Sequence, residues 1–556
     1  MPLTARQREV VQQGDGEYAK WYPWLTLCQT LAENFHPMRA DFTRTRFMSE
    51  EFASYLMTGR PAMAHRDLSN SLAAMLRQKD TQWFLARTPS DDINNDVVAR
   101  RWLDRASQIQ YHVMYALDAN FVRAMKEADQ DYSAFGQAVL EIRPNARYDG
   151  LLFSTHHLKD CVWFENSEHH IDGLQRKWRP QARQLCQKFP GKVSDKVVEL
   201  RKKEPFREIE CRHIVVSTSD YDYDDRRGMR APFISLHVDI ENDCVLEEKP
   251  LRVFPYVVPQ WARVSNSPIA YSPATILALP DARMLQDMTL TIQEAGQKVV
   301  DPPMIGVGEA INGDTNLQAG GVTWTDADYD ERTGEVLRPI TLAPEGLQFG
   351  AAREDRIEKM IDNAFFLNQI RMPTITKEMT ADETERVYQE FIRQAVPLLE
   401  PIETEYSGKV CGTSFETLME MRAFGPLQSV PKILAGSDIK FNFDSPLQAA
   451  KEKLKVGNFQ QAMKIVIEAA QVKADVVDNF DVDGGTRDAV MAQAGGDWII
   501  PEKQVAQTRA DRAKHAQAQQ AAATIGAAGD AAQRVAGAVK TAGDAQQTLQ
   551  QAGIGQ

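Results

Sequence analysis

The pattern of apolar and polar positions is most regular between residues 279 and 405. Apolar residues recur there at helical spacing, with Gln, Asp and Glu on the opposite side. This predicts a helix from about Asp281, directly after Pro280, to Val300. Two prolines then end the helix, because a residue before proline avoids the α-helical conformation. A second apolar stripe predicts a helix over residues 351–370. The chain is therefore expected to run out along one helix, through an insert, and back along another.

A loop at residues 371–380 follows the returning helix. Thr380 and Glu383 have the spacing of a capping box, which predicts that a long helix begins after the loop. The chain stays mainly helical in pattern over residues 381–500. The last segment, residues 501–556, is rich in Ala and Gln, which are good helix formers, but its apolar face is thin. A barrel of helices packed around an axis and a disordered tail are equally compatible with this composition.

In the N-terminal half of the chain, the spacing of apolar residues changes once, from helical to alternating. Residues 1–137 are mostly helical in pattern and rich in large aromatic residues, which we interpret as core. Residues 138–268 alternate between apolar and polar positions, and one helix at 179–189 interrupts them. The expected strands of this second region are Val139–Ile142, Leu151–Phe153, Val162–Phe164, Ile214–Val216, Phe233–Val238 and Cys244–Leu246. Together the two regions predict an α+β fold.

The insert between the paired helices, residues 301–350, is rich in Gly and acidic residues and contains short strand patterns. It is predicted to form a small β module with a hairpin turn. Trp324, Asp326 and Tyr329 are candidates for a docking surface, because aromatic residues are enriched at interface hot spots. Burial of Trp324 inside the module is an equally good interpretation.

Composition narrows the class of protein. The chain has 556 residues and a formal net charge of −13, so it lacks the positive footprint of a general nucleic-acid binder. An acidic channel through which DNA slides without sticking stays compatible with that charge. The chain has no apolar run of the ~20 residues that a membrane helix needs. Its six cysteines are scattered without a CxxC pair, which favours free thiols in a reducing compartment.

Catalytic signatures are absent from the sequence. It contains no phosphate-binding GxxxxGK[ST] loop, no GxGxxG, no HExxH and no GxSxG. His156, His157, Cys161, His169 and His170 are metal-ligand residue types, but adjacent histidines on a strand face opposite ways, and we favour a polar surface. We therefore expect no enzymatic activity, no metal and no cofactor.

The segment with the paired helices resembles the portal proteins, or head-to-tail connectors, of short-tailed double-stranded-DNA bacteriophages. Residues 279–300 followed by Asp-Pro-Pro carry the resemblance, as do residues 377–386 leading into 397–403. The resemblance implies a helical wing at 1–137 with a β-rich part at 138–268. It further implies a two-helix stem at 269–300 and 351–370, a clip at 301–350 and a tunnel loop at 371–380. A long wing helix and crown at 381–500 and a helical barrel or tail at 501–556 complete it.

In function, the resemblance implies a homo-oligomeric ring, typically of twelve subunits, at one vertex of the capsid. Double-stranded DNA would pass through the ring during packaging and ejection, independently of its sequence. The implied partners are the terminase large subunit, the major capsid protein, a scaffold and a tail adaptor. The protein would be located in the virion after assembly in the host cytoplasm, without a membrane.

Arg371 and Lys377 in the loop are the candidates for contact with DNA phosphates. Ion pairs of these two residues with Glu378 or Asp382 are equally compatible with the sequence. The acidic run at residues 220–225 supports an alternative, a metal-dependent nuclease or hydrolase. A structural tail or scaffold component that does not contact DNA is a further alternative.

Overall fold

The computed structural model describes residues 2–47, 50–78, 81–221, 231–306, 337–339, 345–370, 381–443, 459, 462–468, 480–486, 505–515 and 517. The chain divides into two compact units, Met1–Ala450 and Lys451–Gln556. In the second unit, residues 462–468, 482–486 and 505–515 are helical, and Arg509 pairs with Asp483. The first unit contains helices and antiparallel sheets, so the expected mixture of helix and sheet is confirmed.

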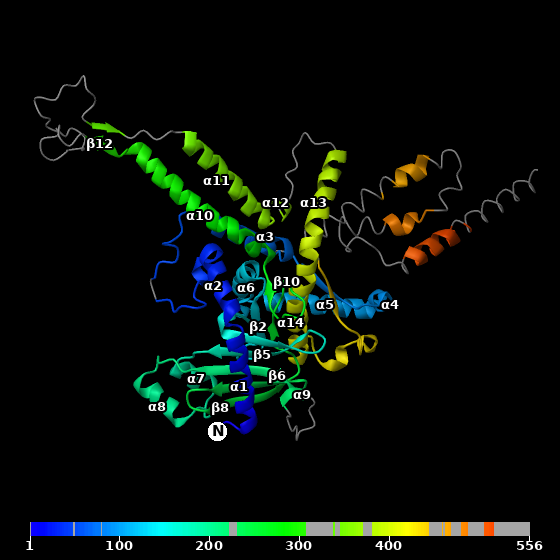
Figure 1. Ribbon diagram of the computed structural model, residues 1–556. Helices are drawn as coiled ribbons and strands as arrows, with labels where there is room; N and C mark the ends of the chain where they lie inside the picture. The colour runs from blue at the N-terminus through cyan, green and yellow to red at the C-terminus, as the bar shows by residue number, and fades with distance from the viewer. Residues whose placement is uncertain are drawn as a thin grey trace, which may run out of the picture. The chain divides into compact units, whose positions relative to one another are not determined.

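The N-terminal part of the first unit is mainly helical (Figure 1). Its helices are α1 Ala5–Lys20, α2 Tyr22–Phe35, α3 Arg60–Leu76, α4 Asp91–Asn95, α5 Val97–Met114 and α6 Phe121–Phe135. Large aromatic side chains such as Trp83, Tyr132 and Phe35 are fully buried in the main core, which confirms their interpretation as core residues. Asn120 adopts a left-handed conformation (φ 57°) directly before α6 and lies between α5 and α6.

The β-rich part holds two antiparallel sheets. A five-stranded sheet has the order β4-β5-β6-β7-β8, and a three-stranded sheet has the order β3-β2-β9. Their strands are β2 Val139–Pro144, β3 Leu151–His156, β4 Cys161–Glu165, β5 Ile171–Trp178, β6 Cys211–Ser217, β7 Phe233–Asp239, β8 Cys244–Leu251 and β9 Tyr256–Val257. The six expected strands are confirmed, whereas β5 was missed because its sequence, IDGLQRKW, lacks an apolar alternation.

Helices cover the sheets from different sides. Leu3 and Val10 of the N-terminal segment pack on Ile234 and Leu236 of the five-stranded sheet. The predicted helix at 179–189 is α7 (Ala182–Lys188), and a second helix, α8 (Asp195–Lys203), packs beside it. The short segments α9 (Thr218–Tyr221), β10 (Ala262–Arg263) and β11 (Ala270–Tyr271) complete this part.

A further strand pair joins two distant parts of the first unit. Strand β1 (Phe84–Arg87) pairs with β14 (Lys440–Phe443) in a two-stranded antiparallel sheet. The pair packs with α5 and α14 (Gly408–Glu420) around Phe415 and Leu103. Such a pairing has no signature in the local sequence, because the partners are far apart along the chain.

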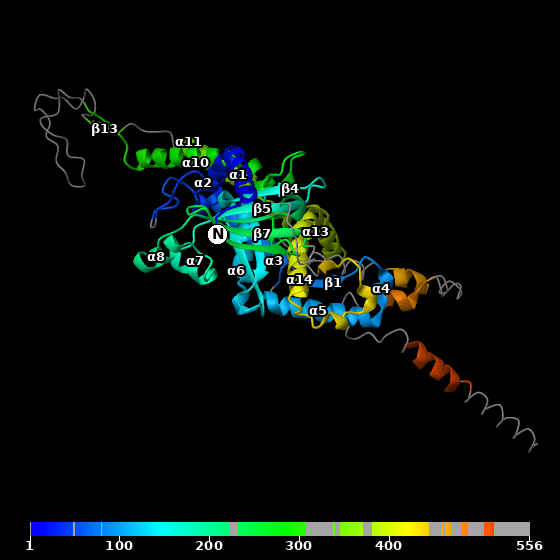
Figure 2. The same cartoon turned by 90° about the horizontal axis from the view of Figure 1, so that it is seen from below.

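The paired helices form an arm, defined here as α10 (Pro273–Val300) and α11 (Glu345–Ala364) (Figures 1 and 2). The prediction that the first helix begins near Asp281 is wrong. Ser272 caps the helix through Thr275 N, and the helix continues through Pro280. Ala274 and Ala278 are fully buried before the proline, so packing compensates for the hydrogen bond that Pro280 cannot donate.

The returning helix also differs from its expected bounds. Phe366 has a positive φ of 57° and divides the predicted segment 351–370 into α11 and the short α12 (Leu367–Ile370). The long helix α13 (Ala381–Ile402) begins directly after Thr380, as predicted. It runs through Pro397 into a π-helix at Glu403–Ser407 and then into α14.

Candidate functional site

The base of the arm is buried in the main core. Ala278, Ala282 and Leu285 of α10 are fully buried, and α10 contacts α2 and α6. On α11, Ile361 is fully buried, and Phe365, just beyond the helix, packs 5.3 Å from the ring of Phe35. Small residues on α10 let its backbone approach the body closely, where the body is the rest of the first unit, outside the arm. This close packing fixes the direction of the arm at its base.

Polar contacts also hold the base of the arm. The amide of Gln286 on α10 accepts hydrogen bonds from the backbone N–H groups of Met57 (2.7 Å) and Thr58 (3.0 Å), and it donates to Thr58 O (2.9 Å). Arg60 of α3 forms a half-buried ion pair with Asp362 of α11. Each helix of the arm therefore has its own polar link to the body.

The two helices pack closely along their length. Gly350 of α11 lies where a side chain would meet Ile292 of α10 at 3.1 Å. Thr289 of α10 donates a hydrogen bond to Glu354 of α11. Burial raises the pKa of Glu358 on α11 above its usual range, against the opposing effect of Arg60 and with a further contribution from Glu354. The carboxylates along this part of α11 therefore repel one another, and a cation of a partner would relieve that repulsion.

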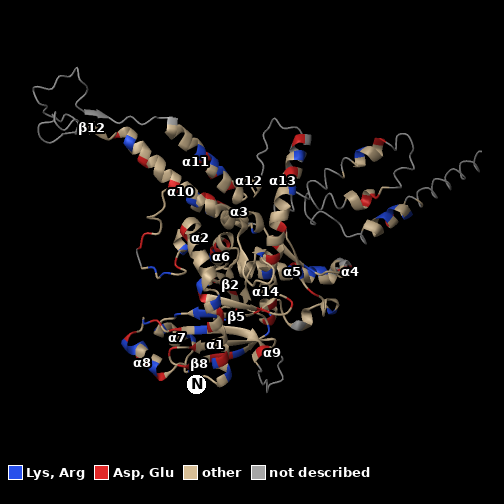
Figure 3. Cartoon of the chain, viewed as in Figure 1, with Lys and Arg blue, Asp and Glu red and all other residues tan. Residues whose placement is uncertain are grey.

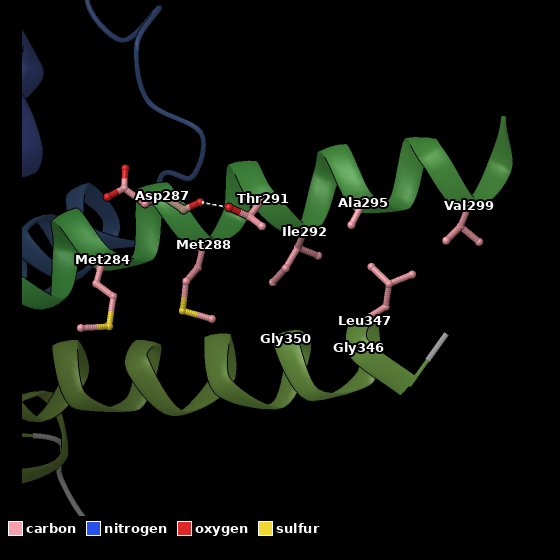
Figure 4. Close-up of a pocket in the computed structure, with 10 residues that line it drawn as sticks. All are labelled: Met284, Asp287, Met288, Thr291, Ile292, Ala295, Val299, Gly346, Leu347 and Gly350. Atoms are coloured by element: carbon pink, nitrogen blue, oxygen red, sulfur yellow. Dashed lines mark hydrogen bonds between the residues drawn. The ribbon is translucent and has the colours of Figure 1, made fainter. Parts of the chain in front are cut away.

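Farther from the body, the arm exposes large apolar side chains instead of burying them. Phe349 is 70% exposed and Val300 87% exposed, and Leu290 and Met360 are also exposed. A cleft of about 440 Å³ opens between the helices, where Met288 and Ile292 of α10 point toward α11 and Leu347 of α11 points toward α10 (Figure 4). A second cleft, of about 500 Å³, involves the exposed side chains of Phe349 and Met360.

Charge is distributed unequally over the arm (Figure 3). Helix α10 has only five charged residues among its 28, whereas α11 has eight among its 20. Arg353 and Arg356 of α11 line the second cleft, and Asp287 of α10 lines the first. The arm thus presents a mostly apolar helix beside a charged one, and exposed apolar side chains bordered by charged ones are typical of protein–protein interfaces.

The residues predicted for docking and for DNA contact are not brought together by the described part of the structure. Trp324, Asp326 and Tyr329, and likewise Arg371 and Lys377, lie outside the described residues. Their flanking segments are described. β12 (Met304–Gly306) pairs with β13 (Leu337–Pro339) at the two ends of the insert, and α12 and α13 border the loop. The five residue assignments stay predictions.

The two adjacent histidines considered for a metal site have carboxylate partners within the fold. His156 is hydrogen-bonded to Glu141 (2.8 Å) and His157 to Asp41 (2.7 Å). Both side chains are largely buried, so the prediction of a polar surface is wrong for them: each histidine has a carboxylate partner inside the fold. Among the described residues, no group of three or more His, Cys, Asp and Glu side chains could hold a metal ion. Of the acidic run at 220–225, only Asp220 and Tyr221 are described.

One further observation concerns membranes. None of the helices in the described part of the chain has the length and apolarity of a membrane span. The exposed apolar side chains of the arm are interrupted by charged residues on both helices, as in a surface that contacts protein.

The fold and the arm together define a protein of mixed helix and sheet with a two-helix arm. Comparison with known families and proteins identifies the family. Residues 15–498 match the family model described as bacteriophage head to tail connecting protein. The chain is 23% identical over 523 residues to the probable portal protein of Bordetella phage BPP-1, with 92% of each chain covered. It is 22% identical over 479 residues to the portal protein of Salmonella phage epsilon15, with 85% of this chain and 84% of the other covered.

Among solved structures, a chain from the virion of a native gene transfer agent particle aligns with a TM-score of 0.34 at 10% identity. The alignment covers 78% of this chain and 95% of the other. A chain from the neck of the same kind of particle, computed with C12 symmetry, also gives a TM-score of 0.34 and covers 72% of this chain and 86% of the other.

The chain belongs to the family of bacteriophage head to tail connecting proteins. It is a portal protein of the head-to-tail connector and a component of the virion. This family is structural, and nothing in the described residues positively indicates catalysis.

Proposed function

We propose that copies of the chain assemble into a closed ring through their arms and that this ring is a passive channel for the genome. Membership of the connector family over residues 15–498 carries the proposal. The exposed apolar surface of the arm supports it. Clefts of about 440 and 500 Å³ on a helix pair leave apolar side chains in water unless a partner covers them.

A neighbouring copy of the chain is the partner that fits this surface best. A ring closes when one face of each subunit contacts a different face of the next. The arm offers two such faces, the cleft bordered by Asp287 and the cleft bordered by Arg353 and Arg356, whose charge exceeds that of Asp281 in the same cleft. Their opposite charges would orient successive arms, because complementary charges at an interface fix its register.

The contacts with other molecules follow from this arrangement. The loop at 371–380 would face the channel, where Arg371 and Lys377 would contact DNA phosphates without reading the sequence. The net charge of −13 limits the number of such contacts, so that DNA can slide. The insert at 301–350, with Trp324, Asp326 and Tyr329, would dock the terminase motor and later a tail adaptor. The wing, clip and crown divisions of the fold belong to the same proposal.

Electron microscopy of the purified full chain, averaged along the ring axis, tests the assembly. We expect closed rings with an open axial channel, and their symmetry gives the number of subunits. Phe349→Ser should abolish rings and leave folded monomers, because it removes an exposed apolar contact without touching the core. Phe206→Ser, at a residue that is 64% exposed outside the arm, is the matched control and should leave rings intact. Monomers from the unmodified chain under all salt conditions, or intact rings from Phe349→Ser, would contradict assembly through the arm.

Packaging tests the role of the loop. The double variant Arg371→Ala/Lys377→Ala should form normal rings but impair DNA packaging or retention, because two phosphate contacts per subunit are lost. Lys196→Ala/Arg201→Ala removes the same charge from α8, far from the loop along the chain, and should package normally. Packaging by the loop variant at the level of this control would remove the assignment to DNA contact and leave the ring proposal standing.

A further inference from the structure

A row of polar residues crosses the five-stranded sheet at a single level. Arg176 of β5 is opposite His213 of β6, His213 is opposite His237 of β7, and His237 is opposite Glu247 of β8. Residues that are opposite one another on adjacent strands project from the same face of the sheet. Both histidines are nevertheless buried, with 3% and 8% of their surfaces exposed. This face of the sheet is therefore polar and covered.

The segments that pack over this face of the sheet leave a cleft of about 350 Å³ beside the row of polar residues. Its buried lining includes His213, Ser235 and His237 from the sheet and Glu141 from β2. Lys188 at the end of α7 and Lys249 of β8 also line the cleft and are exposed, so the cleft is open to solvent beside these two lysines. Arg143 of β2 is a third lining cation and lies 3.8 Å from Glu141. None of these residues belongs to the arm or to the loop at 371–380.

Most buried polar groups around the cleft have partners inside the fold. Glu141 is hydrogen-bonded to His156 at 2.8 Å and lies 3.5 Å from Arg176. The ring of His213 is hydrogen-bonded through Nε2 to Ser235 Oγ (2.8 Å) and through Nδ1 to the hydroxyl of Tyr256. Burial lowers the pKa of His213 to about 3, so this histidine is neutral.

His237 is the exception in this network. Its ring stacks on His213 at 4.0 Å, and its Nε2 lies 3.4 Å from Lys188 Nζ. Its Nδ1 is buried and has no hydrogen-bond partner in the described residues. Burial lowers the pKa of His237 well below its usual range, so the ring carries one proton. An ammonium group can only donate, so Lys188 donates to Nε2, and the ring proton is on Nδ1. His237, which lines the cleft, therefore has a buried N–H donor without an acceptor among the described residues.

The charges around the cleft point to the kind of acceptor that is missing. The carboxylates of Glu141 and Glu247 are already paired, Glu141 with Arg176 and Glu247 with Lys192 at 3.1 Å. Neither Lys188 nor Lys249 forms an ion pair with a described residue. Trp178 Nε1 is a second buried donor that lacks a described partner, and Lys188 Nζ lies 4.7 Å from the Trp178 ring. The two lysines therefore lack a carboxylate partner and the two buried N–H groups lack acceptors among the described residues, although Glu420 also lines the cleft.

We propose that this cleft is a binding site for a compact oxyanion, of the phosphate or carboxylate kind, whose oxygens accept hydrogen bonds from His237 Nδ1 and Lys188 Nζ. An oxyanion supplies several acceptors in a small volume, and hydrogen bonds to a charged partner are the strong ones. The site is separate from ring assembly and from DNA contact, so it does not depend on the proposed channel.

Isothermal titration of the full chain with inorganic phosphate at constant ionic strength tests the site, with chloride as the reference anion. A parallel titration with succinate distinguishes a phosphate site from a carboxylate site. We expect saturable binding of one of the two anions. Lys188→Met should weaken it by about tenfold or more, the loss of one charge-assisted hydrogen bond. Lys196→Met removes the same charge from the exposed face of α8 and should leave the dissociation constant unchanged.

A second pair of variants tests the proton on Nδ1. His237→Asn keeps an N–H donor near the Nδ1 position and should retain binding, whereas His237→Gln keeps one only near Nε2 and should lose it by about tenfold. Circular dichroism confirms that each variant is folded. Absence of saturable binding of either anion would overturn the proposal. Equal affinity of the Lys188→Met variant and the unmodified chain, or of the Asn and Gln variants, would also overturn it.

Discussion

The sheet region and the arm differ in which side chains they bury and which they expose. Around the five-stranded sheet, polar side chains such as His213 are buried and most are paired within the chain. On the arm, apolar side chains such as Phe349 and Val300 are exposed. Burial of polar groups without partners and exposure of apolar groups without cover are both unfavourable. The sheet region therefore completes most of its polar interactions within one chain, whereas the arm leaves apolar side chains exposed, which a neighbouring copy would cover in the proposed ring.

The largest expected loss of stability comes from removing one partner of a buried ion pair in the body. Arg77 donates to both carboxylate oxygens of Asp129 at 2.5 Å, and both side chains are nearly inaccessible to solvent. Arg77→Met leaves the buried Asp129 carboxylate without its cation, so we expect a loss of about 3–5 kcal/mol of unfolding free energy. Urea denaturation followed by tryptophan fluorescence measures it.

The control for this variant is an ion pair on the surface of α6. Arg123 and Glu127 pair at 3.1 Å with both side chains exposed, so Arg123→Met should cost less than about 1 kcal/mol. Similar losses in the two variants would show that burial does not govern the stability of the body.

The unfolding free energy of the body should fall gradually as the pH is lowered. Burial lowers the pKa of His36 to about 4 and those of His65 and His213 to about 3. In the unfolded chain these histidines take up protons near pH 6.5, whereas in the fold they stay neutral until a much lower pH. Their stabilisation is therefore complete above pH 6.5 and is lost as pH falls, by about 1.4 kcal/mol per pH unit for each histidine.

His65→Gln isolates one of these three contributions. Nε2 of His65 is hydrogen-bonded to the backbone carbonyl of Gln130 at 2.9 Å, and glutamine keeps a donor there without titrating. Unfolding free energy measured between pH 6.5 and 5 should fall less steeply in this variant than in the unmodified chain. Parallel curves would show that His65 does not contribute to the acid sensitivity.

The smallest expected change in stability comes from alanine substitutions at two glycines of the arm, one in open space and one at the contact between its two helices. Gly296 of α10 has open space around it, so Gly296→Ala should stabilise the helix by up to about 1 kcal/mol through helix propensity. A methyl group at Gly350 would meet Ile292 at 3.1 Å, so Gly350→Ala should gain less or lose stability. Hydrogen exchange of the α10 and α11 amides measures both. Equal protection in the two variants would mean that the helices are not tightly packed at this point.

Much of the fold follows from local patterns. The helical spacing of apolar residues predicted the two helices of the arm, and strict alternation predicted strands β2, β3, β4, β6, β7 and β8. The bounds were less predictable. Pro280 was expected to precede the first helix, and Phe366 interrupts the second. Both differences arise from packing at the base of the arm, where buried neighbours outweigh local conformational preferences.

The candidate sites differ in the same way. The two helices of the arm were predicted from their apolar stripes, but the exposure of their apolar side chains was not. The oxyanion cleft was not predicted either, because Ser235 and His237 occupy the polar positions of β7, which alternation assigns to solvent. A histidine on each of two adjacent strands was the available signal, and it acquires meaning only when the register brings His213 and His237 together.

The sequence by itself determined the periodic elements, the mixed class of the fold and the resemblance to head-to-tail connectors, because each depends on residues that are close together along the chain or on a recognisable order of segments. The tertiary structure alone decided which polar residues are buried and paired, which apolar residues of the arm stay exposed, and that β1 pairs with β14. These properties depend on contacts between distant residues, whose free energy has no trace in the local spacing of side chains.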